Sequence, residues 1–164
     1  NAAGYACVEV RGTGGGAVGP GVEWTARRAY PLVGQTYYER KTLDLLTAIQ
    51  ALRQETNVKE IVVYGRGAEA AVAVYAALLD PDISEVILQD PVVTHWKGGP
   101  EFMNVLKTGD LPHNLALAFP RPISFIGTMP KEYEWTKRCY DSCGEGGKVR
   151  VFNQQGRWSR YAHN

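Results

Sequence analysis

Short apolar runs alternate with helix-forming stretches along the chain. Between the runs, leucine and isoleucine recur at helical spacing in Thr42–Glu55, strong helix formers fill Glu69–Leu79, and Lys131–Cys143 predicts a third helix that ends near Gly144. Because strand and helix alternate, we expect crossover connections and a mostly parallel sheet in a three-layer α/β sandwich. The apolar runs that predict strands, each bounded by Gly, Pro or Asp, are Tyr5–Val10, Glu60–Tyr64, Glu85–Gln89, Ile123–Ile126 and Val149–Asn153.

One connection between predicted strands is a long insertion rather than a single helix. The stretch from Val92 to Pro122 separates two predicted strands and holds a short helical piece around Phe102–Leu106 and the segment Leu115–Phe119. A long insertion after the carboxyl end of a strand usually covers a site. We therefore expect residues 1–164 to form a single domain with a lid-like insertion at about 92–122.

Composition limits the partners. The chain has 164 residues, 45% of them apolar, and a formal net charge of +1, which is enough for one sizeable core. The near-neutral charge gives no electrostatic reason to expect nucleic acid or an acidic membrane surface as a partner. No apolar run approaches the length of a membrane helix, which predicts a soluble folded part. The first residues lack the basic and apolar regions of a signal peptide.

The cysteines and histidines do not suggest a metal site. Cys7, Cys139 and Cys143 lack the paired spacing of zinc ligands. We expect Cys7 in the core of a strand and the other two half-buried on a helix. His95 and His113 lie in the insertion without a partner at metal-ligand spacing.

The turn "GRGAEA", which starts at Gly65 and joins a predicted strand to a helix, fits the G-x-G-x-x-A pattern of dinucleotide sites. Gly65 would make the tight turn, Gly67 would admit a phosphate, and Ala70 would pack against the strand. Asp90, after the next strand, stands near where an acid would hold a ribose. Glu69, however, would oppose a phosphate at the helix N-terminus, and a strand and a long helix already precede the unit. A dinucleotide-binding module remains an alternative.

The order of three segments points to a second interpretation. "GYACVEVRGTG", "ALRQETNVKEIVVYGRGAEAAVAVYAALLDPDISEVILQDP" and "FMNVLKTGDLPHNLALAFPRPISFIGTMP" follow one another along the chain. Together they resemble α/β hydrolases of the acetyl xylan esterase type, from Gly4 to about Phe152. The resemblance implies a strand with an R-G-x-G loop, then the nucleophile elbow, then the strand leading to the catalytic acid. It begins partway through that fold, so we expect a sheet truncated at its N-terminal edge.

Carried over by this resemblance, the nucleophile position falls on Gly67, which has no side chain. For the acid, the resemblance leaves Glu132, shifted from the usual place, or Asp90 at the end of the preceding strand. The only histidine after the last predicted strand is His163. None of the serines lies on a strand-to-helix turn where a hydroxyl could be presented; they are Ser84, Ser124, Ser142 and Ser159.

Candidate binding residues lie beside the elbow and in the insertion. Arg66 and Asp90 could bind a carboxylate or a sugar hydroxyl by forked hydrogen bonds. His95 and Trp96 are candidates in the insertion, since aromatic side chains can stack on sugars.

The sequence therefore predicts a hydrolase-like domain that has lost catalysis and serves a structural, pairing or carbohydrate-binding role. The expected partners are an acetylated polysaccharide or a small ester, or another segment or chain that completes the sheet. No cofactor is expected. A second alternative is an active esterase whose nucleophile comes from another segment or chain.

Overall fold

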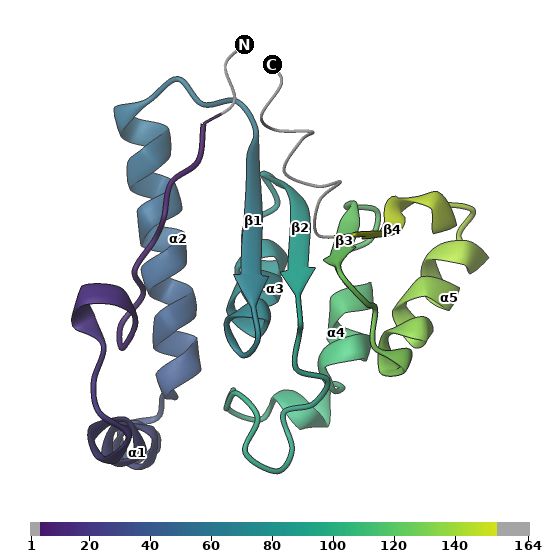
Figure 1. Cartoon of the computed structure of the whole chain (residues 1–164). Helices are drawn as coiled ribbons and strands as arrows, with labels where there is room; N and C mark the ends of the chain where they lie inside the picture. The colour runs from purple at the N-terminus through teal and green to yellow at the C-terminus, as the bar shows by residue number, and fades with distance from the viewer. Residues whose placement is uncertain (1–3, 154–164) are drawn as a thin grey trace.

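Four parallel strands form the centre of the molecule (Figure 1). The computed structural model describes residues 4–153. Each neighbouring pair of strands is parallel. The predicted α/β class with a parallel sheet is thus confirmed. The strands lie in the order β1-β2-β3-β4, with bounds Ile61–Arg66, Ile83–Gln89, Ile123–Ile126 and Val149–Phe152.

Helices α3, α4 and α5 join successive strands; in Figure 1, α3 lies behind β1 and β2, as a right-handed crossover requires, and α4 and α5 lie beside β3 and β4. Helix α2 packs on α3 beside β1. Within residues 4–153, no helix combines the length and apolar character needed to cross a membrane. Helices α1 to α5 have the bounds Pro20–Ala29, Tyr37–Glu55, Glu69–Leu79, Leu111–Ala116 and Glu134–Ser142. Short 3-10 turns lie at Gly14–Gly16, Tyr30–Val33, Val105–Lys107, Lys131–Tyr133 and Gly146–Lys148.

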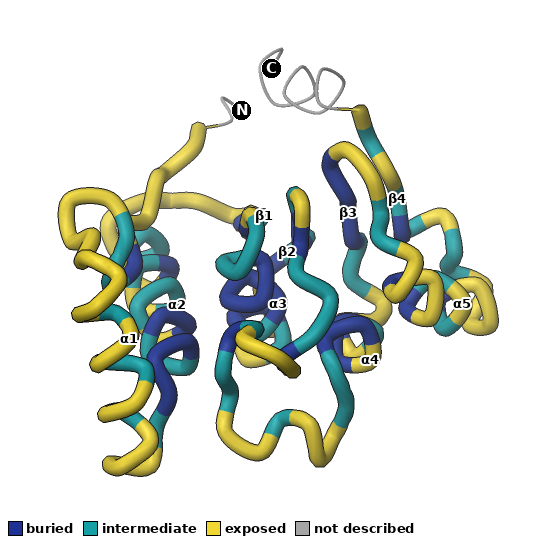
Figure 2. Tube along the Cα trace, turned by 60° about the horizontal axis from the view of Figure 1, so that its bottom comes forward, coloured by how far each residue is buried: buried dark blue, intermediate teal, exposed yellow. Residues whose placement is uncertain are grey.

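Most residues of helix α3 are buried, as its largely dark blue colour in Figure 2 shows. It packs against β1 and β2, where Val63 and Leu88 face the core. Small side chains allow a helix to approach a sheet closely and to fill the space without voids. The buried residues of α3 are Ala70, Ala71, Val72, Ala73, Val74, Ala76 and Ala77.

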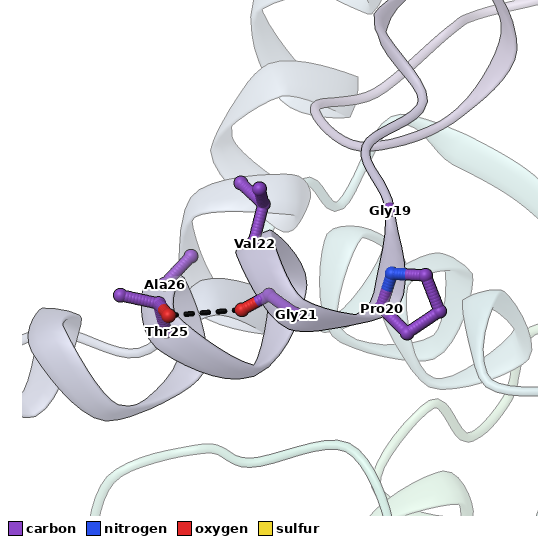
Figure 3. A pocket seen from close by; sticks show the side chains of 6 residues that line it. All are labelled: Gly19, Pro20, Gly21, Val22, Thr25 and Ala26. Carbon is purple, nitrogen blue, oxygen red and sulfur yellow. Dashed lines mark hydrogen bonds between the residues drawn. The ribbon is translucent and has the colours of Figure 1, made fainter.

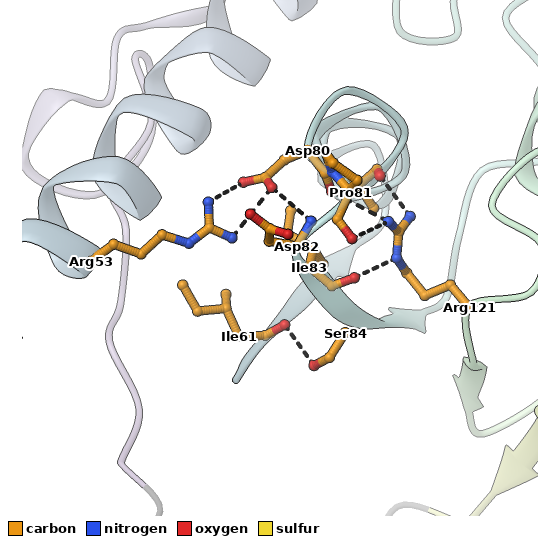
Figure 4. Close-up of polar contacts among 9 residues, drawn as sticks. Arg53, Ile61, Asp80, Pro81, Asp82, Ile83, Ser84 and Arg121 are labelled. Carbon is orange, nitrogen blue, oxygen red and sulfur yellow. Dashed lines mark hydrogen bonds and ion pairs between the residues drawn. The ribbon is translucent and has the colours of Figure 1, made fainter. Parts of the chain in front are cut away.

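Arg121 closes the C-terminal end of α3 (Figure 4). The last carbonyl groups of a helix have no partner within it, so a cationic donor there is favourable. On the other side, the Asp80 carboxylate accepts from Arg53 of α2 at 2.7 Å. We call Arg121 and the carbonyls that it binds the Arg121 clamp. Its guanidinium donates to the main-chain oxygens of Ala77, Asp80, Pro81 and Ile83.

The predicted strand at Tyr5–Val10 is wrong. Residues 4–9 are exposed and have no regular secondary structure, and none of them forms a main-chain hydrogen bond to another main-chain group of the described residues. Cys7 is exposed as well, so its predicted place in the core is also wrong. The apolar alternation fits a strand, but a strand also needs a neighbouring backbone to pair with.

Two helical features differ from the prediction. No helix is predicted before Thr42, yet α1 begins at the end of the glycine-rich residues 12–21, with Pro20 at a first-turn position where a missing N–H costs nothing. Helix α2 begins at Tyr37, earlier than predicted, because Thr36 and Glu39 form a reciprocal capping box.

The third predicted helix is divided in the structure. A 3-10 turn precedes α5, and Gly144 follows it with the positive φ of +77° that suits a glycine C-cap. Cys139 is half-buried as expected. Cys143 lies just beyond the last helical residue and is exposed, which corrects the expectation for it.

Candidate functional site

The turn between β1 and α3, residues 65–70, lies at the carboxyl edge of the sheet. We call it the elbow turn. At Gly65 an added Cβ would lie 2.5 Å from the main-chain oxygen of Glu69 and 2.7 Å from the Cα of Ala70, so the turn excludes any side chain there. Gly67 has φ +58°, and a Cβ built on it meets nothing within 4 Å. The turn therefore presents position 67 to open space, while the residue there offers no functional group.

The backbone of the elbow turn is tied on one side to β2. The Gly67 N–H donates to Gln89 O at 3.0 Å, and Gly67 O accepts from Val92 N at 3.4 Å. The Ala68 N–H, by contrast, makes no hydrogen bond to any atom of residues 4–153. A main-chain N–H at this place can donate to an oxygen atom of a ligand, which is the role of an oxyanion donor in hydrolases.

A buried lysine supports the turn from α2. Lys41 has only 4% of its side chain exposed, and its Nζ lies 2.6 Å from Glu69 Oε1. The same Nζ lies 5.1 and 4.9 Å from the ring centroids of Tyr37 and Tyr38, within cation–π range. Burial, with the Glu69 carboxylate next in importance, raises the pKa of Tyr38 to about 12. This pair places a carboxylate at the start of α3, where a phosphate of a dinucleotide would otherwise be favoured.

Arg66 and Asp90 flank Gly67 at the ends of β1 and β2. Arg66 Nε lies 3.3 Å from Asp90 Oδ2, and their side chains are 67% and 58% exposed. Asp90 has φ +46°, a left-handed conformation that Asp adopts more readily than most residues. Such an exposed pair is weak and exchanges readily with water, so both side chains are available to a ligand.

The remaining candidates for a catalytic triad are dispersed. Glu132 is exposed in the 3-10 turn before α5, and no interaction in the described part of the chain joins it to the elbow turn. His163 lies outside the described residues.

Each described serine hydroxyl is used elsewhere in the fold. Ser84 donates to Ile61 O at 2.9 Å, Ser142 donates to Arg138 O at 2.8 Å, and Ser124 donates to Glu85 Oε1 at 2.5 Å. As predicted, none of these three lies on a strand-to-helix turn.

His95 is buried in a hydrogen-bonded chain. Its Nδ1 lies 2.7 Å from Pro100 O, which can only accept, so Nδ1 carries the proton and Nε2 accepts from Tyr75 Oη at 2.6 Å. Tyr75 accepts in turn from Asn114 Nδ2 at 2.9 Å. Burial raises the pKa of Tyr75 to about 12. Both ring nitrogens of His95 are engaged within the chain, which makes it a residue that orders the loop after β2.

Asp110 holds the same loop from the other side. Its carboxylate accepts from Thr94 Oγ1 at 2.5 Å and from the main-chain N–H groups of His95 and Leu111 at 2.8 Å each. Burial acts to raise the pKa of Asp110, but these hydrogen bonds outweigh it and hold the pKa below its ordinary value. Trp96, also in this loop, is 64% exposed.

Sequence reasoning did not single out the residues that tie this insertion to α1 and α2. Arg27 of α1 donates to Glu101 Oε1 at 2.6 Å, and Glu39 Oε1 accepts from Met103 N at 2.7 Å. Lys41, which supports the elbow turn, was also missed. The T-x-x-E pattern of residues 36–39 was a readable signal for Glu39, whereas nothing in the sequence marks Lys41 or Arg27 for these contacts.

Among the depressions on the surface of residues 4–153, two lie away from the elbow turn and include none of its residues. One runs along α1, where Thr25 donates to Gly21 O at 2.9 Å (Figure 3). Its lining is almost entirely apolar and comes from one helix, so it lacks the converging polar groups of a ligand site. The other lies between α1 and residues 98–101, beside Trp24 and Arg28.

The parallel sheet, the tight strand–turn–helix and the order of the elements form an α/β fold that is shared with solved structures of esterases. One solved structure with this fold is a Bacteroides fragilis protein described as an acetyl xylan esterase. It superposes with a TM-score of 0.67 at 17% identity, over 90% of this chain and 45% of its own. Methylesterase BT1017 matches with a TM-score of 0.57 at 16% identity, over 84% of this chain and 32% of its own.

This chain thus spans less than half the length of these esterase structures. No protein-family model matches the sequence, and a search of curated proteins finds no match.

Proposed function

We propose that this chain is an α/β-hydrolase-like domain that has lost ester hydrolysis and binds an acetylated polysaccharide or a small ester at its elbow turn. The observation that carries the proposal is Gly67. It is half-buried in a turn where Gly65 excludes any side chain, a Cβ built on it meets nothing within 4 Å, and it has no nucleophilic atom. A turn of this shape without a nucleophilic side chain can still hold an ester, but it cannot attack the ester.

The polar groups around Gly67 support binding. The Ala68 N–H can donate to a carbonyl oxygen of an acetyl group, and Arg66 can donate to the same oxygen or to a neighbouring hydroxyl. Asp90 can accept from a sugar hydroxyl. The ion pair between Arg66 and Asp90 is weak because both side chains are exposed. A ligand that bonds to both side chains therefore displaces only this weak interaction.

Affinity electrophoresis in gels containing acetylated xylan tests this proposal, with deacetylated xylan as the reference gel. We expect the wild-type chain to be retarded more strongly by the acetylated polymer. Arg66→Ala and Asp90→Asn should weaken the retardation about tenfold, the usual cost of a hydrogen bond to a charged group. Asn is chosen at position 90 because it also tolerates the left-handed backbone.

Arg138→Ala, which removes an exposed arginine of α5, is the matched control and should migrate as the wild type does. Equal retardation of all four proteins would refute binding at the elbow turn.

A further inference from the structure

The depression between α1 and residues 98–101 is built by two segments that lie far apart in the sequence. Its volume is about 480 Å³, within the range of small-molecule sites. Arg27 joins the two segments, since its Nε donates to Glu101 Oε1 at 2.6 Å and its Nη2 donates to Gly99 O at 3.1 Å. These bonds are made within the protein, so Arg27 shapes the depression and holds its two sides together.

Trp24 and Arg28 line the same depression one helical turn apart on α1. Trp24 is 60% exposed, and the guanidinium carbon of Arg28 lies 4.4 Å from the centroid of the Trp24 ring. The guanidinium of Arg28 makes no hydrogen bond or ion pair to any atom of residues 4–153. A cation–π contact at an exposed site is weak, so Arg28 can move aside for a ligand that covers the indole and can pair with an anionic group of that ligand.

Glu23 adds a hydrogen-bond acceptor to the depression. It is half-buried in the first turn of α1, and its carboxylate makes no hydrogen bond or ion pair within the part of the chain that the structure describes. An ionised carboxylate accepts hydrogen bonds from hydroxyl groups. Because Glu23 and Glu101 both line the depression, their charges favour a ligand with one negative charge over a doubly charged phosphate.

We propose that this depression binds a uronic acid residue, which is a sugar ring that carries a carboxylate. The apolar face of the ring would cover Trp24, the carboxylate would pair with Arg28, and the hydroxyl groups would donate to Glu23. A neutral sugar would leave Arg28 without an anion, and an aromatic acid would leave Glu23 without donors. The depression includes no residue of the elbow turn, so this binding does not depend on the ligand proposed there.

An NMR titration of the whole chain with methyl β-D-glucuronide tests the proposal. Methyl β-D-glucoside is the reference ligand, because it has the same ring without the carboxylate. The signals to follow are the indole N–H of Trp24 and the Nε–H of Arg28. We expect the glucuronide to shift both signals saturably, with a dissociation constant of about 1 mM. The glucoside should bind about tenfold more weakly, because it lacks the hydrogen bond between charged groups.

Two variants separate the contribution of the charge from that of the ring. Arg28→Gln removes the charge of an exposed side chain, so it should weaken glucuronide binding about tenfold and leave glucoside binding unchanged. Trp24→Ala removes the stacking surface and should weaken the binding of both sugars, with Arg28 Nε–H as the signal. Arg138→Gln, which changes an exposed arginine of α5, is the matched control and should bind both sugars as the wild type does.

Four results would overturn the proposal. The first is the absence of a saturable shift at Trp24 with glucuronide up to about 20 mM, and the second is equal affinity for the glucoside. The third is an equal loss of affinity for both sugars in Arg28→Gln, because the charge would then play no specific part. The fourth is tighter binding of adenosine monophosphate than of glucuronide, which would assign the depression to a ligand with a phosphate group.

Discussion

The two ends of helix α3 carry out different tasks. At its C-terminal end, the Arg121 clamp satisfies four main-chain carbonyls, and Asp80 is paired with Arg53. At its N-terminal end, the elbow turn exposes position 67, leaves the Ala68 N–H without a partner among residues 4–153, and carries an ion pair that is mostly in water.

The two ends of α3 differ in how their polar groups are used. The clamp uses a cation against the negative end of the helix, and it leaves little for a ligand to bind. At the elbow turn, the buried Lys41 of α2 stabilises the turn through Glu69, while Arg66 and Asp90 stay accessible. The polar groups of the first end are therefore used within the fold, whereas those of the second are left accessible for the binding role proposed above.

Gly65→Ala should cause the largest loss of stability. The new methyl group would lie 2.5 Å from Glu69 O and 2.7 Å from Ala70 Cα, so backbone must move, at a cost of about 3 kcal/mol or more. Urea unfolding measures the change. Gly67→Ala is the matched control: it meets open space and should cost about 1 kcal/mol for its left-handed φ. Equal losses would contradict the close packing seen at Gly65.

Arg121→Ala should follow, with a loss of about 2 kcal/mol in the free energy of unfolding, because several charge-assisted hydrogen bonds are removed together. Arg121→Lys keeps the charge but not the planar fork, so it should recover only part of the loss. A variant as stable as the wild type would show that the clamp is dispensable.

At low pH, the loop around His95 should open before the Arg121 clamp does. Hydrogen bonds hold the pKa of Asp110 below the ordinary 3.8 of an aspartate, so its stabilising effect is complete above that pH and is lost as the pH falls through the lower folded value. Carbonyl acceptors in the clamp do not titrate. Hydrogen exchange between about pH 5 and pH 2.5 should therefore rise first in the loop around His95, and Asp110→Asn should remove that early rise. Simultaneous opening of residues 77–84 would refute this order.

Arg66→Ala should have the smallest effect on stability, within about 0.5 kcal/mol, because exposed ion pairs contribute little. Thermal unfolding at low and high salt checks this. A loss comparable to that of Arg121→Ala would mean that Arg66 is a structural residue, and the proposed binding role would lose its basis.

The buried half of this fold could be predicted from the sequence and the exposed edge could not. Four strands and the bounds of α3 follow from runs of apolar or small residues, because a buried segment requires such residues. Tyr5–Val10 has the same pattern, but pairing depends on a neighbouring backbone that local sequence does not specify. The positions of Gly67, Arg66 and Asp90 were predicted together from the turn. The Lys41–Glu69 pair was not, since the two residues lie 28 positions apart and meet only through the packing of α2 on α3.

Fluorophosphonate labelling of the native chain tests whether the chain has lost ester hydrolysis. These probes react with an activated serine, and we expect labelling no greater than that of the denatured protein, with no turnover of p-nitrophenyl acetate. Labelling of the native chain above that level, abolished by one serine-to-alanine substitution, would contradict the claim and show that a nucleophile outside the elbow turn has kept the esterase chemistry.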